Sequence, residues 1–236
     1  MKLRTRVILH LAALCVALAA NGFAADNAYL YVVNGAPGRD VATNLNPGFP
    51  VDILINGVCQ SHGLAYDSTD GPLSFAAGTY TVQISEANTL APCTNAAIAD
   101  SNVTLTSGDS TSAVISVSTG QPTILQFSDA LSAISAGDAR FVFANAADVA
   151  ELQVTLTQTG VTNPKTFTLT ANSGAEGTLT VADGSYTVQV TASGSSTVLA
   201  TETVTLASQS AIFVYATGES SNSSIGLVNK TVLDVF

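Results

Sequence analysis

The sequence predicts an all-β protein with two tandem immunoglobulin-like antiparallel β-sandwich domains after a cleaved signal peptide. Three observations lead to this fold class: a signal-like N-terminal segment, a long internal repeat, and strands in which apolar and polar residues alternate. The chain has 236 residues, of which 47% are hydrophobic and 10% charged, whereas charged residues usually make up about 25%. A charged, disordered chain is therefore excluded.

The first 24 residues have the three parts of a secretory signal peptide. Basic residues open the chain, an apolar run covers residues 7–20, and Gly22 and Ala24 are small, as signal cleavage requires. We expect the mature chain to begin near Ala25, with cleavage after Ala25 as the alternative. The apolar run is shorter than the roughly 20 residues of a transmembrane helix. The expectation is a protein in the periplasm, at the cell surface or outside the cell, without a membrane span after cleavage.

Charge bears on the partners of the mature chain. Without the signal segment it has four basic and seventeen acidic residues, a net charge of −13. The basic residues are scattered along the sequence: Arg39, Arg140, Lys165 and Lys230. Because nucleic-acid binding needs clustered Lys and Arg, nucleic acid is not expected as a partner. The acidity indicates solubility and self-repulsion.

Two cysteines, Cys59 and Cys93, remain in the mature chain, since Cys15 lies in the signal segment. A lipid anchor on Cys15 is not expected, because Leu14 stands where a lipoprotein signal has a small residue. An even number of cysteines in an exported chain predicts a disulfide. Closing this loop would stabilise the fold by roughly 3–4 kcal/mol in the loop-entropy model. Two buried thiols are the alternative.

An internal repeat sets the domain organisation. Residues 73–84 reappear as residues 179–190, and residues 102–107 match residues 203–208. We therefore expect two homologous domains, residues 26–130 and residues 139–236. The short join of small residues between them predicts that they are closely coupled.

Each repeat predicts seven or eight strands of a sandwich. Tyr80, Val82 and Ile84 alternate with polar residues, the period of a strand buried on one face, and Asn56-Gly57 indicates a hairpin. The Gly-x-Tyr-x-Val pieces, Gly78 to Val82 and Gly184 to Val188, predict a tyrosine corner in each repeat. There Gly78 and Gly184 allow the turn, and the hydroxyls of Tyr80 and Tyr186 reach a backbone carbonyl.

Three stretches of the first repeat resemble a family of exported bacterial and archaeal proteins that contain domain of unknown function 4397. They are Val32-Val33-Asn34-Gly35-Ala36-Pro37, Val51-Asp52-Ile53-Leu54-Ile55-Asn56-Gly57, and the segment from Leu73 to Val82. The second repeat keeps the Tyr186 strand but departs from the first pattern at Asn145-Ala146-Ala147-Asp148. The resemblance implies a β-sandwich of the cell envelope. It implies no catalytic residue.

The sequence offers no convincing catalytic, metal or cofactor site. His62 is the one histidine outside the signal segment, and no Gly-x-Ser-x-Gly elbow accompanies it. His62, Asp67 and Asp70 match no metal-binding spacing, and the two aspartates are better explained by a turn. We expect no enzyme, no metal and no cofactor.

These observations favour a structural or interaction module of the cell envelope, with a protein or polysaccharide as partner. The alternative is a module that binds carbohydrate or another ligand through the long loops of the first repeat, with Tyr31, Phe49 and Tyr66 as stacking surfaces. Weakly charged strands also leave self-assembly open.

Overall fold

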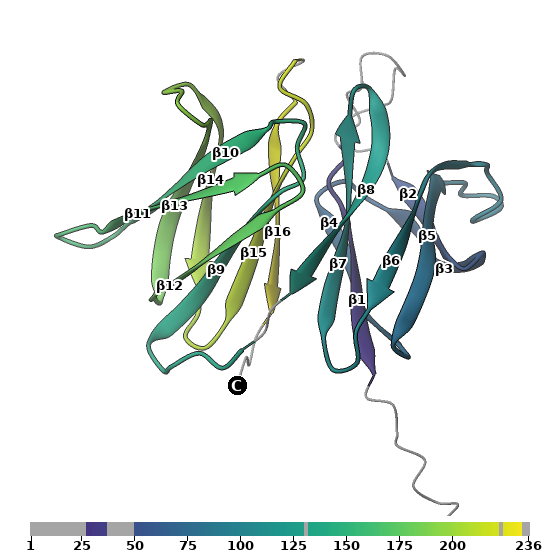
Figure 1. Cartoon of the computed structure of the whole chain (residues 1–236), viewed down its shortest axis with the longest axis horizontal. Helices are drawn as coiled ribbons and strands as arrows, with labels where there is room; N and C mark the ends of the chain where they lie inside the picture. The colour runs from purple at the N-terminus through teal and green to yellow at the C-terminus, as the bar shows by residue number, and fades with distance from the viewer. Residues whose placement is uncertain (1–26, 37–49, 130–131, 222–223, 233–236) are drawn as a thin grey trace, which may run out of the picture.

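The computed structural model describes residues 27–36, 50–129, 132–221 and 224–232, and in these ranges the chain forms strands and no helix. The predicted signal peptide and Phe49 lie outside the described residues. No helix in the described ranges is long and apolar enough to cross a membrane. Two groups of eight strands follow one another along the chain (Figure 1).

The first eight strands form two four-stranded sheets. Sheet A has the order β4-β1-β7-β8 and sheet B the order β3-β2-β5-β6. Their bounds are β1 Ala28–Asn34, β2 Val51–Ile55, β3 Val58–Leu64, β4 Ser68–Phe75, β5 Gly78–Glu86, β6 Ala97–Leu105, β7 Ser110–Ser118 and β8 Gln121–Asp129.

The second eight strands repeat this topology. Sheet C has the order β12-β9-β15-β16 and sheet D the order β11-β10-β13-β14. Their bounds are β9 Asp138–Asn145, β10 Glu151–Gln158, β11 Thr166–Asn172, β12 Glu176–Ala182, β13 Gly184–Ala192, β14 Val198–Leu206, β15 Ala211–Thr217 and β16 Gly226–Val232. Two tandem β-sandwiches, the predicted fold class, are thereby confirmed.

One pair of strands in each sandwich departs from the antiparallel pattern that the sequence predicts. In sheet A, β1 runs parallel to β7, with Tyr29 opposite Ser110. In sheet C, β9 runs parallel to β15, with Arg140 opposite Ala211. A parallel pair needs a long crossover connection, and the five intervening strands supply one in each repeat.

Local sequence explains the turn between β2 and β3. Asn56 and Gly57 both have positive φ, 50° and 75°, as a two-residue type I′ hairpin requires. The Asn56 side-chain oxygen also accepts a hydrogen bond of 2.8 Å from the backbone N–H of Thr81. The hairpin is therefore tied to β5, the next strand of sheet B.

Each sandwich has its own apolar core, and a tyrosine closes one end of each. The hydroxyl of Tyr80 donates to the carbonyl oxygen of Ala76 at 2.9 Å, and that of Tyr186 to Ala182 at 2.8 Å. Tyr186 is 1% exposed, whereas the Tyr80 ring is partly exposed and packs against Phe75. The two repeats thus form the same tyrosine hydrogen bond, which is more buried in the second sandwich than in the first.

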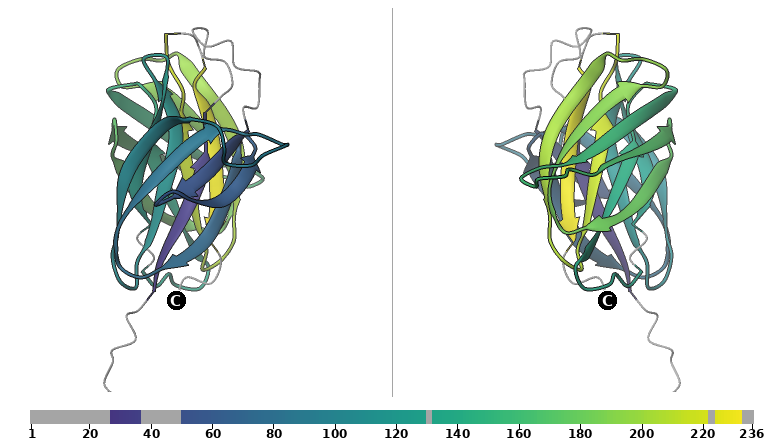
Figure 2. Two further views of the ribbon diagram at one scale, coloured as in Figure 1. Left: turned by 90° about the vertical axis from the view of Figure 1, so that its right-hand side faces the viewer. Right: turned by 90° about the vertical axis from the view of Figure 1, so that its left-hand side faces the viewer.

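The two sandwiches pack on each other through sheets A and C. In the views of Figure 2, sheets B and D form the two outer faces, so that the layers run B, A, C, D (Figures 1 and 2). A third apolar cluster joins the inner sheets; its buried members are Val33, Val114, Phe127, Ile134, Val142, Ala144, Ala146, Ala211, Phe213, Tyr215 and Val228. The approach is close, since a Cβ on Gly35 would lie 2.4 Å from Cγ2 of Thr217.

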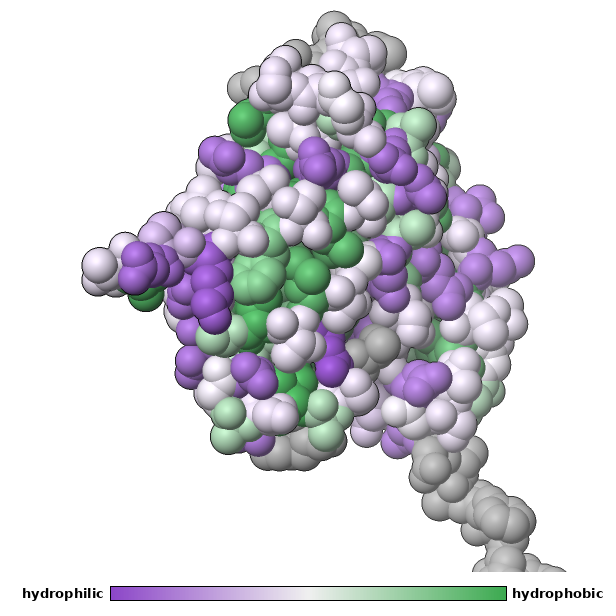
Figure 3. All heavy atoms as spheres, turned by 60° about the vertical axis from the view of Figure 1, so that its left-hand side comes forward, coloured by the Kyte–Doolittle hydropathy of each residue, from purple (hydrophilic) through white to green (hydrophobic). Residues whose placement is uncertain are grey.

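The second sandwich is more open on one side. Figure 3 shows apolar side chains at its surface, surrounded by polar ones. Partly buried apolar residues of the edge strands β11 and β12 include Phe167, Leu169 and Leu179, which pack against the core. Each inner sheet, by contrast, is covered on both faces.

Replacing Tyr186 by Phe should lower the free energy of unfolding by about 1 kcal/mol or more, because the carbonyl of Ala182 loses the donor of a partly buried hydrogen bond. Tyr80→Phe should cost less, because its hydrogen bond lies at the surface. Equilibrium urea denaturation of both variants checks this. A Tyr186→Phe protein with the stability of the parent would contradict the proposed contribution of the corner.

Candidate functional site

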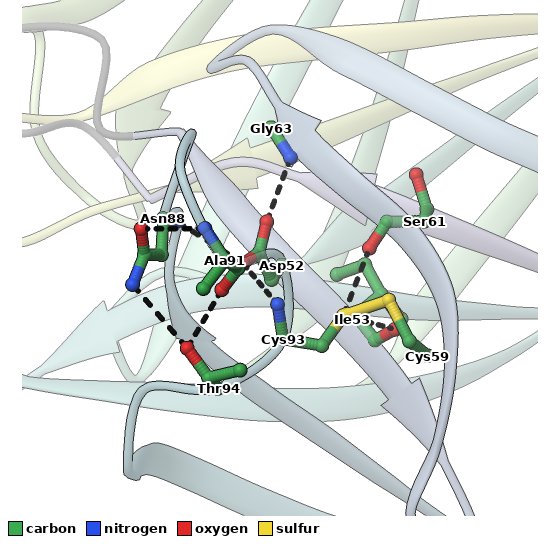
Figure 4. The surroundings of a disulfide bond; sticks show 9 residues. All are labelled: Asp52, Ile53, Cys59, Ser61, Gly63, Asn88, Ala91, Cys93 and Thr94. Carbon is green, nitrogen blue, oxygen red and sulfur yellow. Dashed lines mark hydrogen bonds between the residues drawn. A yellow bond between two sulfur atoms is a disulfide. The ribbon is translucent and has the colours of Figure 1, made fainter.

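A disulfide braces the longest described loop of the first sandwich. Cys59 in β3 is bonded to Cys93 in the connection between β5 and β6, with a Cα–Cα distance of 5.8 Å (Figure 4). The predicted disulfide is confirmed. We refer to residues 87–96 as the Cys93 loop.

The carboxylate of Asp52 fixes the backbone around this disulfide. Asp52 is fully buried in β2. Its Oδ1 accepts the N–H of Gly63 at 2.9 Å, and its Oδ2 accepts those of Asn88 at 3.1 Å and Cys93 at 2.7 Å (Figure 4). One side chain therefore ties β2 to both segments that the disulfide joins.

These hydrogen bonds change the acidity of Asp52. Burial disfavours the charged carboxylate and is the largest single effect. The three backbone donors, of which Cys93 contributes most, and the smaller effect of His62 together outweigh it. The net result is a lowered pKa. Asp52 is thus a charged side chain of β2 that has a structural role beside the loop.

A second network shapes the tip of the Cys93 loop. The side-chain oxygen of Asn88 accepts the N–H groups of Leu90 and Ala91, both at 3.1 Å. Its amide nitrogen donates to Thr94 Oγ1 at 3.3 Å, and that hydroxyl donates to the carbonyl of Ala91 at 2.7 Å. Leu90 is left 95% exposed. The loop therefore presents an apolar side chain on a backbone fixed by internal bonds.

The structure places two of the predicted ligand-loop aromatics at the domain interface. Tyr31 projects from β1 into this interface, where its ring centroid lies 3.9 Å from the Lys230 amine. Tyr66 packs against the apolar cluster of the same interface, and Phe49 lies outside the described residues. Tyr31 and Tyr66 are both partly exposed, and ligand stacking on them stays a prediction.

His62 is exposed on β3, and Asp67 and Asp70 lie at the start of β4 and within it. In the described part of the chain, no group of three or more His, Cys, Asp or Glu residues is arranged to hold a metal ion. Burial raises the pKa of Asp67.

An ion pair joins the two sandwiches inside their interface. The amine of Lys230, in β16, lies 2.6 Å from Oδ2 of Asp129, in β8, and the two side chains are 4% and 0% exposed. Lys230 also donates to Ser112 Oγ at 2.7 Å. The hydroxyls of Ser110 and Ser112 donate to the Asp129 carboxylate at 2.9–3.0 Å, and Tyr215 donates to Ser112 at 2.8 Å.

Aromatic rings and a second carboxyl surround this pair. The Lys230 amine lies 3.9 Å from the ring centroid of Tyr31 and 4.4 Å from that of Phe213. Burial lowers the pKa of Lys230, although Asp129 opposes that shift. Burial and the charge of Asp129 raise the pKa of Glu176, in β12, to about 7. Two buried ionisable groups, Lys230 and Asp129, and the partly buried Glu176 thus lie at the interface.

The family of the chain follows from its first ten strands. A family model described as domain of unknown function (DUF4397) matches residues 28–155. The chain belongs to the DUF4397 family. The match covers the first sandwich and extends into β10 of the second.

Solved structures similar to this DUF4397 chain share little sequence with it. A candidate cell adhesion protein from Bacteroides fragilis is 12% identical, covers 88% of this chain and 98% of its own, and has a TM-score of 0.27. A candidate cell adhesion protein from Bacteroides ovatus is 9% identical, with 90% and 99% covered and a TM-score of 0.30. The Bacillus anthracis TIE protein is 10% identical, and the chain spans 34% of its length, with 82% of this chain covered and a TM-score of 0.28. The comparison with curated proteins gives no match.

Two polar residues of the DUF4397 motifs have structural roles that the sequence did not reveal. Asp52 fixes the disulfide region, as described above. Asn34 is fully buried; it accepts the N–H of Ala36 at 3.1 Å and donates to the carbonyl of Leu64 at 2.9 Å. Asn145 repeats this in the second sandwich, accepting from Ala147 and donating to Val149. The asparagine at the end of β1 and β9 is therefore shared by both repeats.

Sequence reasoning also missed Lys230, Asp129 and Glu176. A signal was available for Lys230, because it is in phase with Val228 along β16 and so falls on the same face of the strand. Nothing local marked Asp129, which comes from another sheet and another repeat, or Glu176, which lies on the opposite edge strand of the same sheet.

Replacing Asp52 by Asn should lower the free energy of unfolding at pH 7 by about 2 kcal/mol, because an amide cannot accept all three N–H groups. The pKa of Asp52 is lower in the folded state. Its contribution is therefore fully present above the pKa of the unfolded chain, near 4, and is lost as the pH falls through the folded value. Urea denaturation between pH 7 and pH 2 should show a shallower acid loss for Asp52→Asn than for the parent.

Asp100→Asn is the matched control for this experiment, since Asp100 is an exposed carboxylate on β6. That variant should follow the parent at every pH. Parallel pH curves for Asp52→Asn and the parent would disprove the role of the Asp52 carboxylate.

Proposed function

We propose that the protein is an exported, non-enzymatic interaction module that contacts a protein or polysaccharide of the cell envelope through the Cys93 loop. One observation carries this proposal: the loop is fixed by a disulfide, by Asp52 and by Asn88, and yet its tip exposes Leu90. Ordering a loop before binding lowers the entropic cost of association. An exposed apolar residue on a rigid loop is therefore suited to recognition.

The arrangement of the two sandwiches supports the same function. Sheets A and C share one apolar cluster and a buried ion pair, so the loop belongs to a body of four layers. A rigid scaffold that presents loops at its ends is a common basis of binding in β-sandwich proteins.

Export is supported by two independent features. The first 24 residues have the basic, apolar and small-residue parts of a secretory signal. The Cys59–Cys93 bond belongs to an oxidising compartment. The carbohydrate alternative based on Tyr31, Phe49 and Tyr66 loses support, because Tyr31 and Tyr66 lie in the domain interface.

Co-sedimentation of the purified mature protein with a cell-envelope preparation from the producing cells tests the proposal. Leu90→Asp should weaken binding about tenfold or more, the size of effect expected of a central contact residue. Unfolding curves should match those of the parent, because Leu90 packs against little of the protein.

Val161→Asp is the matched control, an equivalent exchange at an exposed residue of the β10–β11 connection in the other sandwich. It should leave binding unchanged. If Leu90→Asp binds as well as the parent, or if the parent does not bind the envelope, the Cys93 loop is not the contact surface.

A further inference from the structure

We propose that Lys230 and Asp129 condense to an intramolecular isopeptide bond that joins the two sandwiches covalently, with the Ser112 hydroxyl relaying the proton. The reacting groups belong to the last strand of each sandwich, β16 and β8. Such a bond would be a modification of the folded chain and would not depend on the function proposed for the Cys93 loop.

The geometry brings the reacting groups together. Nζ of Lys230 lies 2.6 Å from Oδ2 of Asp129, and the side chains are 4% and 0% exposed. Positioning of this kind replaces an encounter in solution by a reaction between fixed neighbours, which is worth many orders of magnitude in rate. Apolar and aromatic residues enclose the pair, among them Tyr31, Phe213 and Phe127.

Burial favours the form of Lys230 that reacts. A free amine is the nucleophile, and burial lowers the pKa of Lys230. A buried ion pair carries a desolvation cost for both charges. Condensation removes both charges, because an ammonium and a carboxylate become a neutral amide.

The hydroxyl of Ser112 bridges the two reacting groups. Nζ of Lys230 donates to Ser112 Oγ at 2.7 Å, and that hydroxyl donates to Oδ1 of Asp129 at 2.9 Å. A proton can therefore pass between the nitrogen and the carboxyl group through one hydroxyl. Glu176 forms no ion pair with Lys230 and no hydrogen bond with Asp129 in the described part of the chain.

The step balances without any other reactant. A proton passes from the Lys230 ammonium to the Asp129 carboxylate, and the amine lone pair then forms a bond to Cγ of Asp129. The negative charge on the carboxyl oxygen is stabilised by the hydroxyls of Ser110 and Ser112, which already donate to this group. The Ser112 hydroxyl accepts the proton from the attacking nitrogen and gives its own proton to the departing hydroxyl. The carbon–oxygen bond breaks, water leaves, and Ser112 ends as it began.

Intact-mass measurement of the purified mature protein, reduced and denatured, tests this directly. We expect a mass lower by one water molecule than the sum of the residues. Digestion with trypsin should yield one cross-linked species that contains Asp129 and an uncleaved Lys230. Protein with the full sequence mass after prolonged incubation at pH 7 in the folded state would overturn the proposal.

Variants assign the roles of the three residues. Lys230→Arg keeps the positive charge but lacks the amine, and it should keep the full mass; Asp129→Ala should do the same. Ser112→Ala should slow the loss of water while the protein stays folded, as judged by its circular dichroism spectrum.

Ser116→Ala is the matched control, since Ser116 is another buried serine of β7 and contacts the second sandwich through Gly218. It should lose water as the parent does. Equal rates of water loss in the parent and Ser112→Ala would rule out Ser112 as the proton relay.

Discussion

Strands β7, β9 and β15 are buried on both faces along almost all of their length, and β1 near its C-terminal end; the arrangement of the two sandwiches depends on them. In β1, β7, β9 and β15, one set of side chains fills the core of its own sandwich and the alternate set points the other way; Ile115 and Val114 of β7 are neighbours on opposite faces. A sheet that is apolar on both sides needs a second cover. Sheets A and C provide that cover for each other, which creates the four-layer body.

The repeats use equivalent surfaces for this contact, but those surfaces have diverged. Cross-strand registers make Ser112 of sheet A equivalent to Phe213 of sheet C, and Phe127 equivalent to Lys230. Asp129 is likewise equivalent to Val232. The acid and its hydroxyl donors therefore lie on one repeat and the base on the other. Two copies of the same sheet could not satisfy these groups, so the divergence favours contact between unlike repeats.

Most of the fold could be predicted from the sequence, because the sequence patterns that indicate its strands and turns are local or occur in both repeats. Alternation around Tyr80, the turn at Asn56-Gly57 and the duplicated Gly-x-Tyr-x-Val pieces depend on neighbours in the chain. The parallel β1/β7 pair and the packing of sheet A on sheet C were not readable, since they join segments about 80 to 100 residues apart. The interface position of Tyr31 was not predicted for the same reason. The sequence pattern of an outward-facing aromatic residue is the same whether a ligand or another domain covers the ring.

The position of Lys230 in the last described strand bears on how the protein reaches its final state. Synthesis delivers the N-terminal sandwich first. Its sheet A then carries Val33, Val114 and the Asp129 carboxylate with no lysine opposite them, until β16 arrives. Between these events the partly synthesised chain exposes an apolar, acidic face to other chains. The final segment thus ends the period in which aggregation is most favoured, and truncations near the C-terminus would prolong it.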